Sequence, residues 1–261
     1  MPAAETAAAA LADPTPFQWA LLPVAAYLAG SIPTAHLIAR SRGIDLGTVG
    51  SRNYGATNLG RTLGRPFGIA CFVLDATKGA LPVLAAGWWT EALGAAPGAM
   101  PVALAWCWLA TAFAAILGHT LSPWIGFKGG KGVATGFGAL AAMWPVLTVP
   151  AASALLLWLV VVAISRMVSL ASMVAAVAIP CMVAVAALTS SGLAGVRASV
   201  PFLVASGAIA LFVVWKHRAN IARIRAGTEA RIGRKSAPAA AASAADAPTP
   251  ATSNETDTTR S

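Results

Sequence analysis

The stretch that decides the fold is residues 134–165, which read ATGFGALAAMWPVLTVPAASALLLWLVVVAIS. It is almost entirely apolar and carries Pro145 and Pro150 near its middle. Proline interrupts the hydrogen bonds of a helix, so each half holds about 15 residues, or about 22 Å of helix, against a hydrocarbon core of about 30 Å. We expect two short helices joined by a proline turn, with one long tilted helix as the alternative.

Several other runs of the chain are just as apolar. The 261 residues are 57% hydrophobic and 10% charged, whereas a soluble domain is about a quarter charged. This composition predicts an all-α, polytopic integral membrane protein. If residues 134–165 form two short helices, the predicted protein has seven transmembrane helices. The expected spans are 17–39, 67–89, 101–121, the two halves of 134–165, 174–188 and 200–215.

Basic residues predict the orientation of these spans. With seven spans, all of the 18 Lys and Arg residues except Lys78, Arg197 and Arg260 fall on one side. We expect that side to be cytoplasmic, with the N-terminus outside and the C-terminus inside. Because the net charge of +9 sits in short loops between apolar runs, it argues for membrane topology and against a nucleic-acid partner.

The chain is expected to divide into three parts. Residues 1–16 form an external N-terminal segment, and residues 17–235 form the seven-helix membrane domain. Residues 236–261 are mostly Ala, Pro, Thr and Ser with scattered charges, a composition that predicts a disordered tail.

Three polar stretches fall on the basic face, and the first, residues 50–61, reads GSRNYGATNLGR. It combines glycines, hydroxyls, carboxamides and guanidinium groups with no acid. Glycine lets the backbone approach a ligand, hydroxyls and amides donate hydrogen bonds, and arginine offers a fork that matches phosphate. Topology requires positive charge here but none of the other groups, so we predict an anion site. Its candidate ligands are Ser51, Asn53, Thr57, Asn58 and Arg61.

The second stretch, residues 126–132, reads GFKGGKG and resembles a phosphate-binding P-loop. The Walker pattern fails because Gly132 stands where Ser or Thr is required, so we expect no nucleotide. What remains is two lysines among glycines, ahead of a helix expected to start near Val133, whose free N–H groups favour an anion. The candidate residues are Lys128, Gly129, Gly130 and Lys131.

The third stretch combines two segments. His217 and Asn220 lie three residues apart at the start of a tail helix and share a face. Ser169 and Ser172 add hydroxyls beside Arg166. His217 is suited either to act as a general base or to donate a hydrogen bond to substrate, and the sequence leaves both roles open.

Ionisable residues also occur within or near the spans. Asp75 and Lys78 lie three residues apart, so we expect a structural ion pair that supports the site. His36 and His119 are expected to be interfacial residues rather than catalysts. No Cys or His spacing fits a metal site, and we expect neither a metal nor a cofactor.

Together these motifs resemble the bacterial acyl-phosphate:glycerol-3-phosphate acyltransferases, the PlsY family. The resemblance runs from about residue 20 to 232 and implies seven transmembrane helices in the bacterial cytoplasmic membrane. It implies acyl transfer from a fatty acyl phosphate to the 1-hydroxyl of glycerol 3-phosphate, giving lysophosphatidic acid and phosphate. The motifs that carry it are residues 30–33, 50–61, 75–79, 118–119, 127–135, 166–172 and 217–221.

The same resemblance implies roles for the candidate residues. Ser51, Asn53, Thr57 and the glycine backbone would hold the acyl phosphate. Glycerol 3-phosphate would be held by Arg61, Lys128 or Lys131, Ser169 or Ser172, His217 and Asn220, while His217, Asn220, Arg61 and Ser51 are the catalytic candidates. The chain departs from the family at Arg52, where glycine is usual, and at residues 34–36, where a glycine and an aromatic residue are more usual.

An acyl phosphate is a mixed anhydride with a good leaving group, so catalysis mainly requires positioning and stabilisation of negative charge. A substrate phosphate can accept the proton, and His217 is the alternative base. The acyl chain would lie between helices, open to membrane lipid. A transporter or exchanger of organic phosphates is the rival function, but its expected paired half-helices and internal symmetry are not visible in the sequence.

Overall fold

In the computed structural model, the described chain runs from residue 11 to residue 233, and all its regular structure is helical. This confirms the all-α prediction for these residues. The expected tail 236–261 and the first ten residues of the expected external segment lie outside the described range. The elements are α1 (Pro16–Ser31), α2 (Thr34–Arg40), α3 (Ala56–Leu63), α4 (Arg65–Trp89), η1 (Pro97–Ala99), α5 (Val102–Thr120), η2 (Pro123–Ile125), α6 (Val133–Ala141), α7 (Thr148–Ser165), α8 (Val168–Ala198), α9 (Val200–Lys216) and α10 (Arg218–Arg225).

Five helical segments of the described chain are long and apolar enough to cross a membrane, and the pair α9 and α10, bent by 58°, would make a sixth. The protein is therefore a multi-pass integral membrane protein, as its composition predicts. The five segments are Pro16–Arg40, Arg65–Trp89, Val102–Ile125, Thr148–Ser165 and Val168–Ala198.

The stretch 134–165 contains two helices, as expected, rather than one long helix. α6 ends at Ala141 and α7 begins at Thr148, with Pro145 in the turn between them. The turn contacts the loop after α4, where the Gly94 N–H donates to the Trp144 carbonyl at 3.0 Å. α6 has only nine residues, or about 14 Å of helix, so it does not span a membrane by itself.

Small residues let α6 pack tightly against α4. A Cβ atom added at Gly138 would collide with the Ala76 carbonyl, and one added at Gly79 would collide with the Thr135 carbonyl. Such close approach is typical of helix contacts within membranes. It positions the start of α6, and therefore the glycine loop before it, against the middle of α4.

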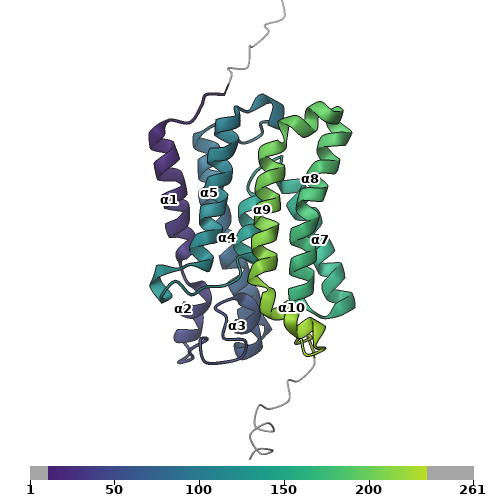
Figure 1. Ribbon diagram of the computed structural model, residues 1–261. Helices are drawn as coiled ribbons and strands as arrows, with labels where there is room; N and C mark the ends of the chain where they lie inside the picture. Colours follow the sequence, from purple (N-terminus) through teal and green to yellow (C-terminus); the bar gives the residue numbers. More distant parts are fainter. Residues whose placement is uncertain (1–10, 234–261) are drawn as a thin grey trace, which may run out of the picture.

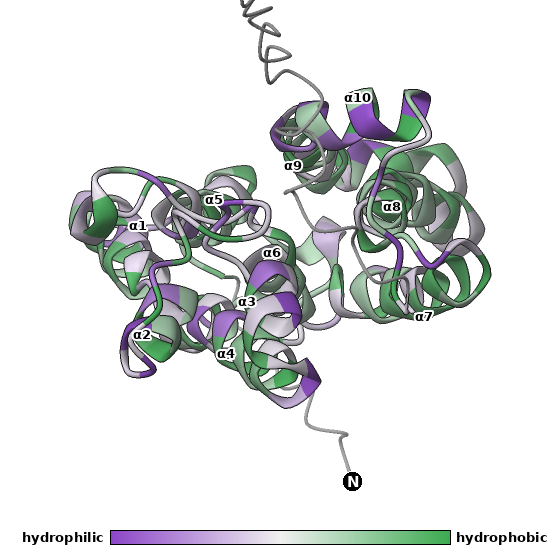
Figure 2. Cartoon of the chain, turned by 90° about the horizontal axis from the view of Figure 1, so that it is seen from below, coloured by the Kyte–Doolittle hydropathy of each residue, from purple (hydrophilic) through white to green (hydrophobic). Residues whose placement is uncertain are grey.

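The bundle has two groups of helices, which Figure 2 shows in end view: α1 to α6 form one and α7 to α10 the other. In the first group α1 packs against α5 and α4 against α6, while in the second α8 packs between α7 and α9. The groups meet through contacts of α5 with α9 and of α6 with α7. At the end of the bundle that carries α2, α3 and α10 (Figure 1), the polar stretches gather.

Two segments differ from the expected spans. α8 extends beyond the expected span 174–188 at both ends, but Ser191 (φ −149°) and Gly192 (φ +58°) leave helical geometry, so the helix is broken there and a short helical segment follows to Ala198. The hydroxyls of Thr189 and Ser190 donate to helix carbonyls, which lets polar residues remain helical. Within the polar loop 40–66, α3 forms a short helix whose buried side carries Asn58 and Leu59.

Candidate active site

A polar cavity with a free volume of about 120 Å³ lies at the end of the bundle formed by α3, α10 and the glycine loop 126–132. Ten of the thirteen predicted site residues line it, although they come from four separate regions of the chain. These ten are Ser51, Asn53, Thr57, Asn58, Arg61, Lys131, Ser169, Ser172, His217 and Asn220. Lys128, Gly129 and Gly130 are not among its lining residues.

Asn58 holds the first loop in shape. Its side chain is 1% exposed, and its amide donates to the carbonyls of Val49 at 3.2 Å and Leu46 at 3.5 Å. Its oxygen accepts from the Ser51 N–H at 2.9 Å. Gly50 has φ +58°, and a Cβ there would collide with the Asn58 oxygen. The polar atoms of Asn58 therefore bond within the first loop and hold it in shape.

Arg52 adopts a backbone conformation that favours glycine. Its φ is +54°, in the left-handed region that L-residues avoid. Its side chain is exposed and lines a separate cavity with Lys128 and Lys216. The departure from glycine at this position therefore adds a cation outside the polar cavity and does not crowd the anion loop.

The two lysines of the glycine loop face different cavities. Lys131 lines the polar cavity, and its ammonium donates to the Asn220 side-chain oxygen. Lys128 is exposed and lines the separate cavity. Gly129 and Gly130 position the loop: a Cβ on either would collide with His119, at its carbonyl or its ring. The Asn53 amide also donates to the Gly129 carbonyl at 3.4 Å, which joins the first two stretches.

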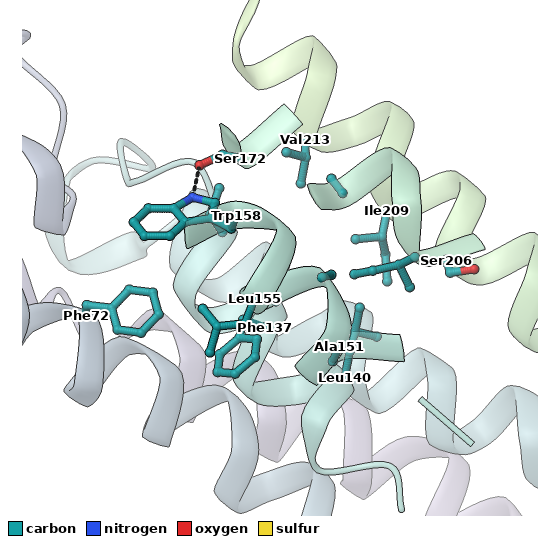
Figure 3. A pocket seen from close by; sticks show the side chains of 16 residues that line it. Phe72, Phe137, Leu140, Ala151, Leu155, Trp158, Ser172, Ser206, Ile209 and Val213 are labelled. Atoms are coloured by element: carbon teal, nitrogen blue, oxygen red, sulfur yellow. Dashed lines mark hydrogen bonds between the residues drawn. The ribbon is translucent and has the colours of Figure 1, made fainter. Parts of the chain in front are cut away.

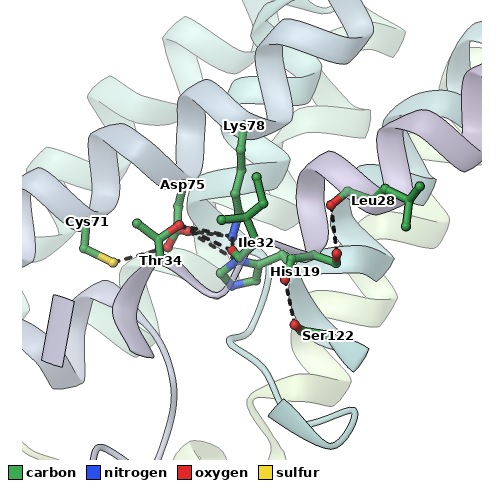
Figure 4. A network of polar contacts seen from close by, with 9 residues as sticks. Leu28, Ile32, Thr34, Cys71, Asp75, Lys78, His119 and Ser122 are labelled. Atoms are coloured by element: carbon green, nitrogen blue, oxygen red, sulfur yellow. Dashed lines mark hydrogen bonds and ion pairs between the residues drawn. The ribbon is translucent and has the colours of Figure 1, made fainter. Parts of the chain in front are cut away.

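A buried ionic network lies behind this loop (Figure 4). The predicted ion pair is confirmed, with Lys78 Nζ 2.8 Å from Asp75 Oδ1. Lys78 also donates to the Ile32 carbonyl at 2.6 Å, at the break between α1 and α2. His119 Nδ1 lies 3.6 Å from the same Asp75 oxygen. His119 is buried and lines the polar cavity, with the glycine loop packed against its ring.

Glu229 is the site residue that the sequence analysis missed. It accepts hydrogen bonds from Ser169 at 2.6 Å, from the Asn220 amide at 2.6 Å and from Arg223 at 2.7 Å. Burial would raise the pKa of Glu229, but these hydrogen bonds outweigh burial and lower the pKa below its ordinary value. The available signal was that Glu229 is the only acid between residues 216 and 235.

The two predicted serines both donate to protein acceptors. Ser169 donates to Glu229, while Ser172 donates to the Val168 carbonyl at 2.8 Å and accepts from the Trp158 indole at 3.2 Å. A hydroxyl has one hydrogen. In this arrangement neither serine has a hydrogen available for an anion in the cavity.

His217 is buried at the junction of α9 and α10. Its Nδ1 lies 2.7 Å from the Val213 carbonyl. Because a carbonyl only accepts, Nδ1 carries the hydrogen and the neutral ring presents a lone pair at Nε2. That nitrogen suits either acceptance of a proton or, once protonated, donation to a substrate oxygen.

The cavity is strongly electropositive. Burial lowers the pKa of Lys131 to about 8; Glu229 raises it, while Arg223, Arg61 and Lys216 lower it further. Burial also lowers the pKa of Arg61, which stays charged as arginines do. Several cations surround the single carboxylate of Glu229. They would repel one another less with an anionic ligand bound, so the cavity suits such a ligand. Across the described residues no group of three His, Cys, Asp or Glu side chains is placed to hold a metal ion.

Known proteins carry the same sequence pattern. The sequence profile of glycerol-3-phosphate acyltransferase matches residues 20–227, most of the chain. The chain belongs to the glycerol-3-phosphate acyltransferase family. Relatives of that name include the protein of Geobacter metallireducens, 45% identical over 217 residues, covering 81% of this chain and 96% of the relative. Another, from Thermosynechococcus vestitus, is 42% identical over 216 residues, covering 82% and 94%.

Two solved structures of the integral membrane glycerol 3-phosphate acyltransferase PlsY (YgiH) share the fold of this acyltransferase. The glycerol 3-phosphate form has a TM-score of 0.68 and 36% identity, and the lysophosphatidic acid form has 0.66 and 34%. Each comparison covers 81% of this chain and 94% of the other. The protein is therefore an integral membrane acyltransferase of phospholipid synthesis, and the rival assignment as a phosphate transporter is set aside.

Proposed function

We propose that this acyltransferase moves a fatty acyl group from acyl phosphate to the 1-hydroxyl of glycerol 3-phosphate, giving lysophosphatidic acid and phosphate. The observation that carries the proposal is the convergence of Arg61, Lys131 and Asn220 on one polar cavity. Two anionic substrates need such a concentration of donors, and no nucleotide, metal or cofactor is required by the reaction.

The donors divide into two groups by position. The phosphate of glycerol 3-phosphate binds between Arg61 and Lys131, with Asn220 and His217 on the glycerol side. The acyl phosphate binds the first loop through Ser51, Asn53 and Thr57. Support comes from the electropositive wall formed by Arg61 and Lys131, and from the buried Asn58, which holds the first loop in shape.

The reaction is one displacement at the acyl carbon. The 1-hydroxyl oxygen adds to that carbon to form a tetrahedral oxyanion, and the bond from carbon to the phosphate oxygen then breaks to release phosphate. The hydroxyl proton passes to a phosphate oxygen of the substrate, and His217 Nε2 is the alternative acceptor. Orientation of bound reactants contributes about 7 to 11 kcal/mol to such reactions, and loop N–H groups stabilise the oxyanion.

We also propose that the chain crosses the membrane seven times, with α6 and its turn together forming one crossing. Support comes from the Gly94–Trp144 hydrogen bond, which brings this turn to the end of the bundle opposite the cavity. The cavity end, which holds most basic residues, faces the cytoplasm of a bacterial inner membrane, with the N-terminus outside. The topology is tested by replacing Gly94 or Gly227 with cysteine and labelling each variant from either side of sealed vesicles. Labelling of both positions from the same side would refute the proposed topology.

The activity is tested by incubating purified protein with labelled glycerol 3-phosphate and one acyl donor at a time. Acyl phosphate alone, in the presence of a metal chelator and without nucleotide or a vesicle gradient, is expected to give lysophosphatidic acid. Product from acyl-coenzyme A or acyl carrier protein but not from acyl phosphate would refute the proposed donor and leave the family assignment intact.

A further inference from the structure

A second cavity, lined mostly by apolar side chains (Figure 3), shares five lining residues with the polar cavity. Its walls come from α4, α6, α7, α8 and α9, and its free volume is about 70 Å³. A ligand with a polar head in the first cavity and an apolar chain in the second must pass the residues that line both. These are Phe72, Gly132, Val133, Trp158 and Ser172.

Trp158 has the largest side chain at this junction, and Ser172 holds it in place. The indole Nε1 donates to Ser172 Oγ at 3.2 Å, a bond marked in Figure 3. Ser172 gives its single hydrogen to the Val168 carbonyl at 2.8 Å. Ser172 therefore accepts the hydrogen bond of Trp158. Its place in the polar cavity alone would have suggested that it binds a phosphate.

The junction lies at a mouth rather than in the closed core. Trp158 and Phe72 are both partly exposed, whereas Ser172 is 4% exposed. Figure 3 shows the Trp158 and Phe72 rings at one end of the cavity and Ser206 with Ile209 at the other. Phe72 is itself held by stacking on Phe137, with ring centroids 6.2 Å apart. The Trp158 indole is held by a single hydrogen bond, to Ser172.

We propose that Trp158, positioned by Ser172, determines which acyl chains the enzyme accepts. The inference rests on the proposed function, in which the acyl chain lies between the helices. Pockets for small ligands usually hold about 300 to 1,000 Å³, so about 70 Å³ leaves little room beyond the indole. The position of the indole therefore sets how much chain the cavity takes. One methylene group in a hydrophobic pocket changes discrimination about 10- to 200-fold.

The test measures equilibrium binding of lysophosphatidic acids with saturated chains of increasing length to the full chain in nanodiscs. Trp158→Phe removes the N–H and one ring, and Ser172→Ala removes only its acceptor. We expect each to shift the preference toward longer chains, changing the affinity ratio of neighbouring lengths about 10-fold, with glycerol 3-phosphate binding unchanged. The matched controls change residues that line neither cavity. Trp88→Phe alters an exposed tryptophan, and Ser190→Ala removes a hydroxyl that, like that of Ser172, donates to an α8 carbonyl.

Unchanged length profiles for Trp158→Phe and Ser172→Ala would overturn the proposal. Weaker glycerol 3-phosphate binding by Ser172→Ala, with an unchanged length profile, would also overturn it and assign the hydroxyl to substrate. If Ser172→Ala does not fold, Trp158→Phe decides alone. Binding of lysophosphatidic acid needs no acyl donor, so this result is independent of whether acyl phosphate is the donor.

Discussion

Replacement of Lys131 by Met is expected to raise the KM for glycerol 3-phosphate strongly, while Lys128→Met leaves it near the wild-type value. Lys131 lines the polar cavity and contacts Asn220, whereas Lys128 points into a separate cavity. A hydrogen bond to a charged group contributes about 1.5 to 3 kcal/mol, which corresponds to about 10- to 150-fold in affinity. Lys128→Met is a matched control because it removes the same charge from the same loop.

The pH dependence gives a second, independent measurement on Lys131. Burial lowers its pKa to about 8, so the charged form that binds an anion predominates below about pH 8 and is lost above it. The KM of the wild type is therefore expected to rise about tenfold for each pH unit beyond the pKa. Lys131→Arg stays charged, so it is expected to abolish this alkaline rise.

Initial rates at saturating acyl donor, measured across a pH series, give KM for all four proteins. Equal KM increases in Lys128→Met and Lys131→Met would contradict the placement of the two side chains. An alkaline rise that persists in Lys131→Met would assign the titration to another group.

Three further changes test other parts of the structure. Glu229→Gln keeps the side-chain shape but replaces an acceptor of three hydrogen bonds by an amide. It is expected to lower stability by about 1 to 3 kcal/mol in thermal unfolding and to lower kcat/KM in initial-rate measurements. Gly138→Ala forces a Cβ into the Ala76 carbonyl and is expected to destabilise by about 1 to 3 kcal/mol, whereas Gly207→Ala, which has open space at its Cβ, is not. Arg52→Gly relieves a positive φ and is expected to gain up to about 1 kcal/mol with activity retained; a clear loss of activity would show that the Arg52 side chain serves the reaction.

Local patterns were sufficient where one physical force acts on one segment. The apolar runs predicted the spanning helices because a bilayer selects length and hydropathy. Pro145 predicted the break between α6 and α7 because proline cannot continue a helix. The pairing of Asp75 with Lys78 followed from three-residue spacing on one helix face. The expected end of the span agrees with the break at Ser191 and Gly192, whereas the short helical segment after it was missed because hydroxyls that bond to helix carbonyls resemble a loop in the sequence.

The sequence by itself determined a multi-pass helical membrane protein and ten of the residues that line its polar cavity, because both depend on composition and short-range spacing. Only the tertiary structure decided that Lys131 rather than Lys128 meets Asn220, that Glu229 joins Ser169 to Arg223, and that Ser172 holds Trp158. Those choices depend on which helices pack together and how each is rotated. Hydrogen bonds such as that from Lys131 to Asn220, 89 residues apart, leave no periodic trace in the chain.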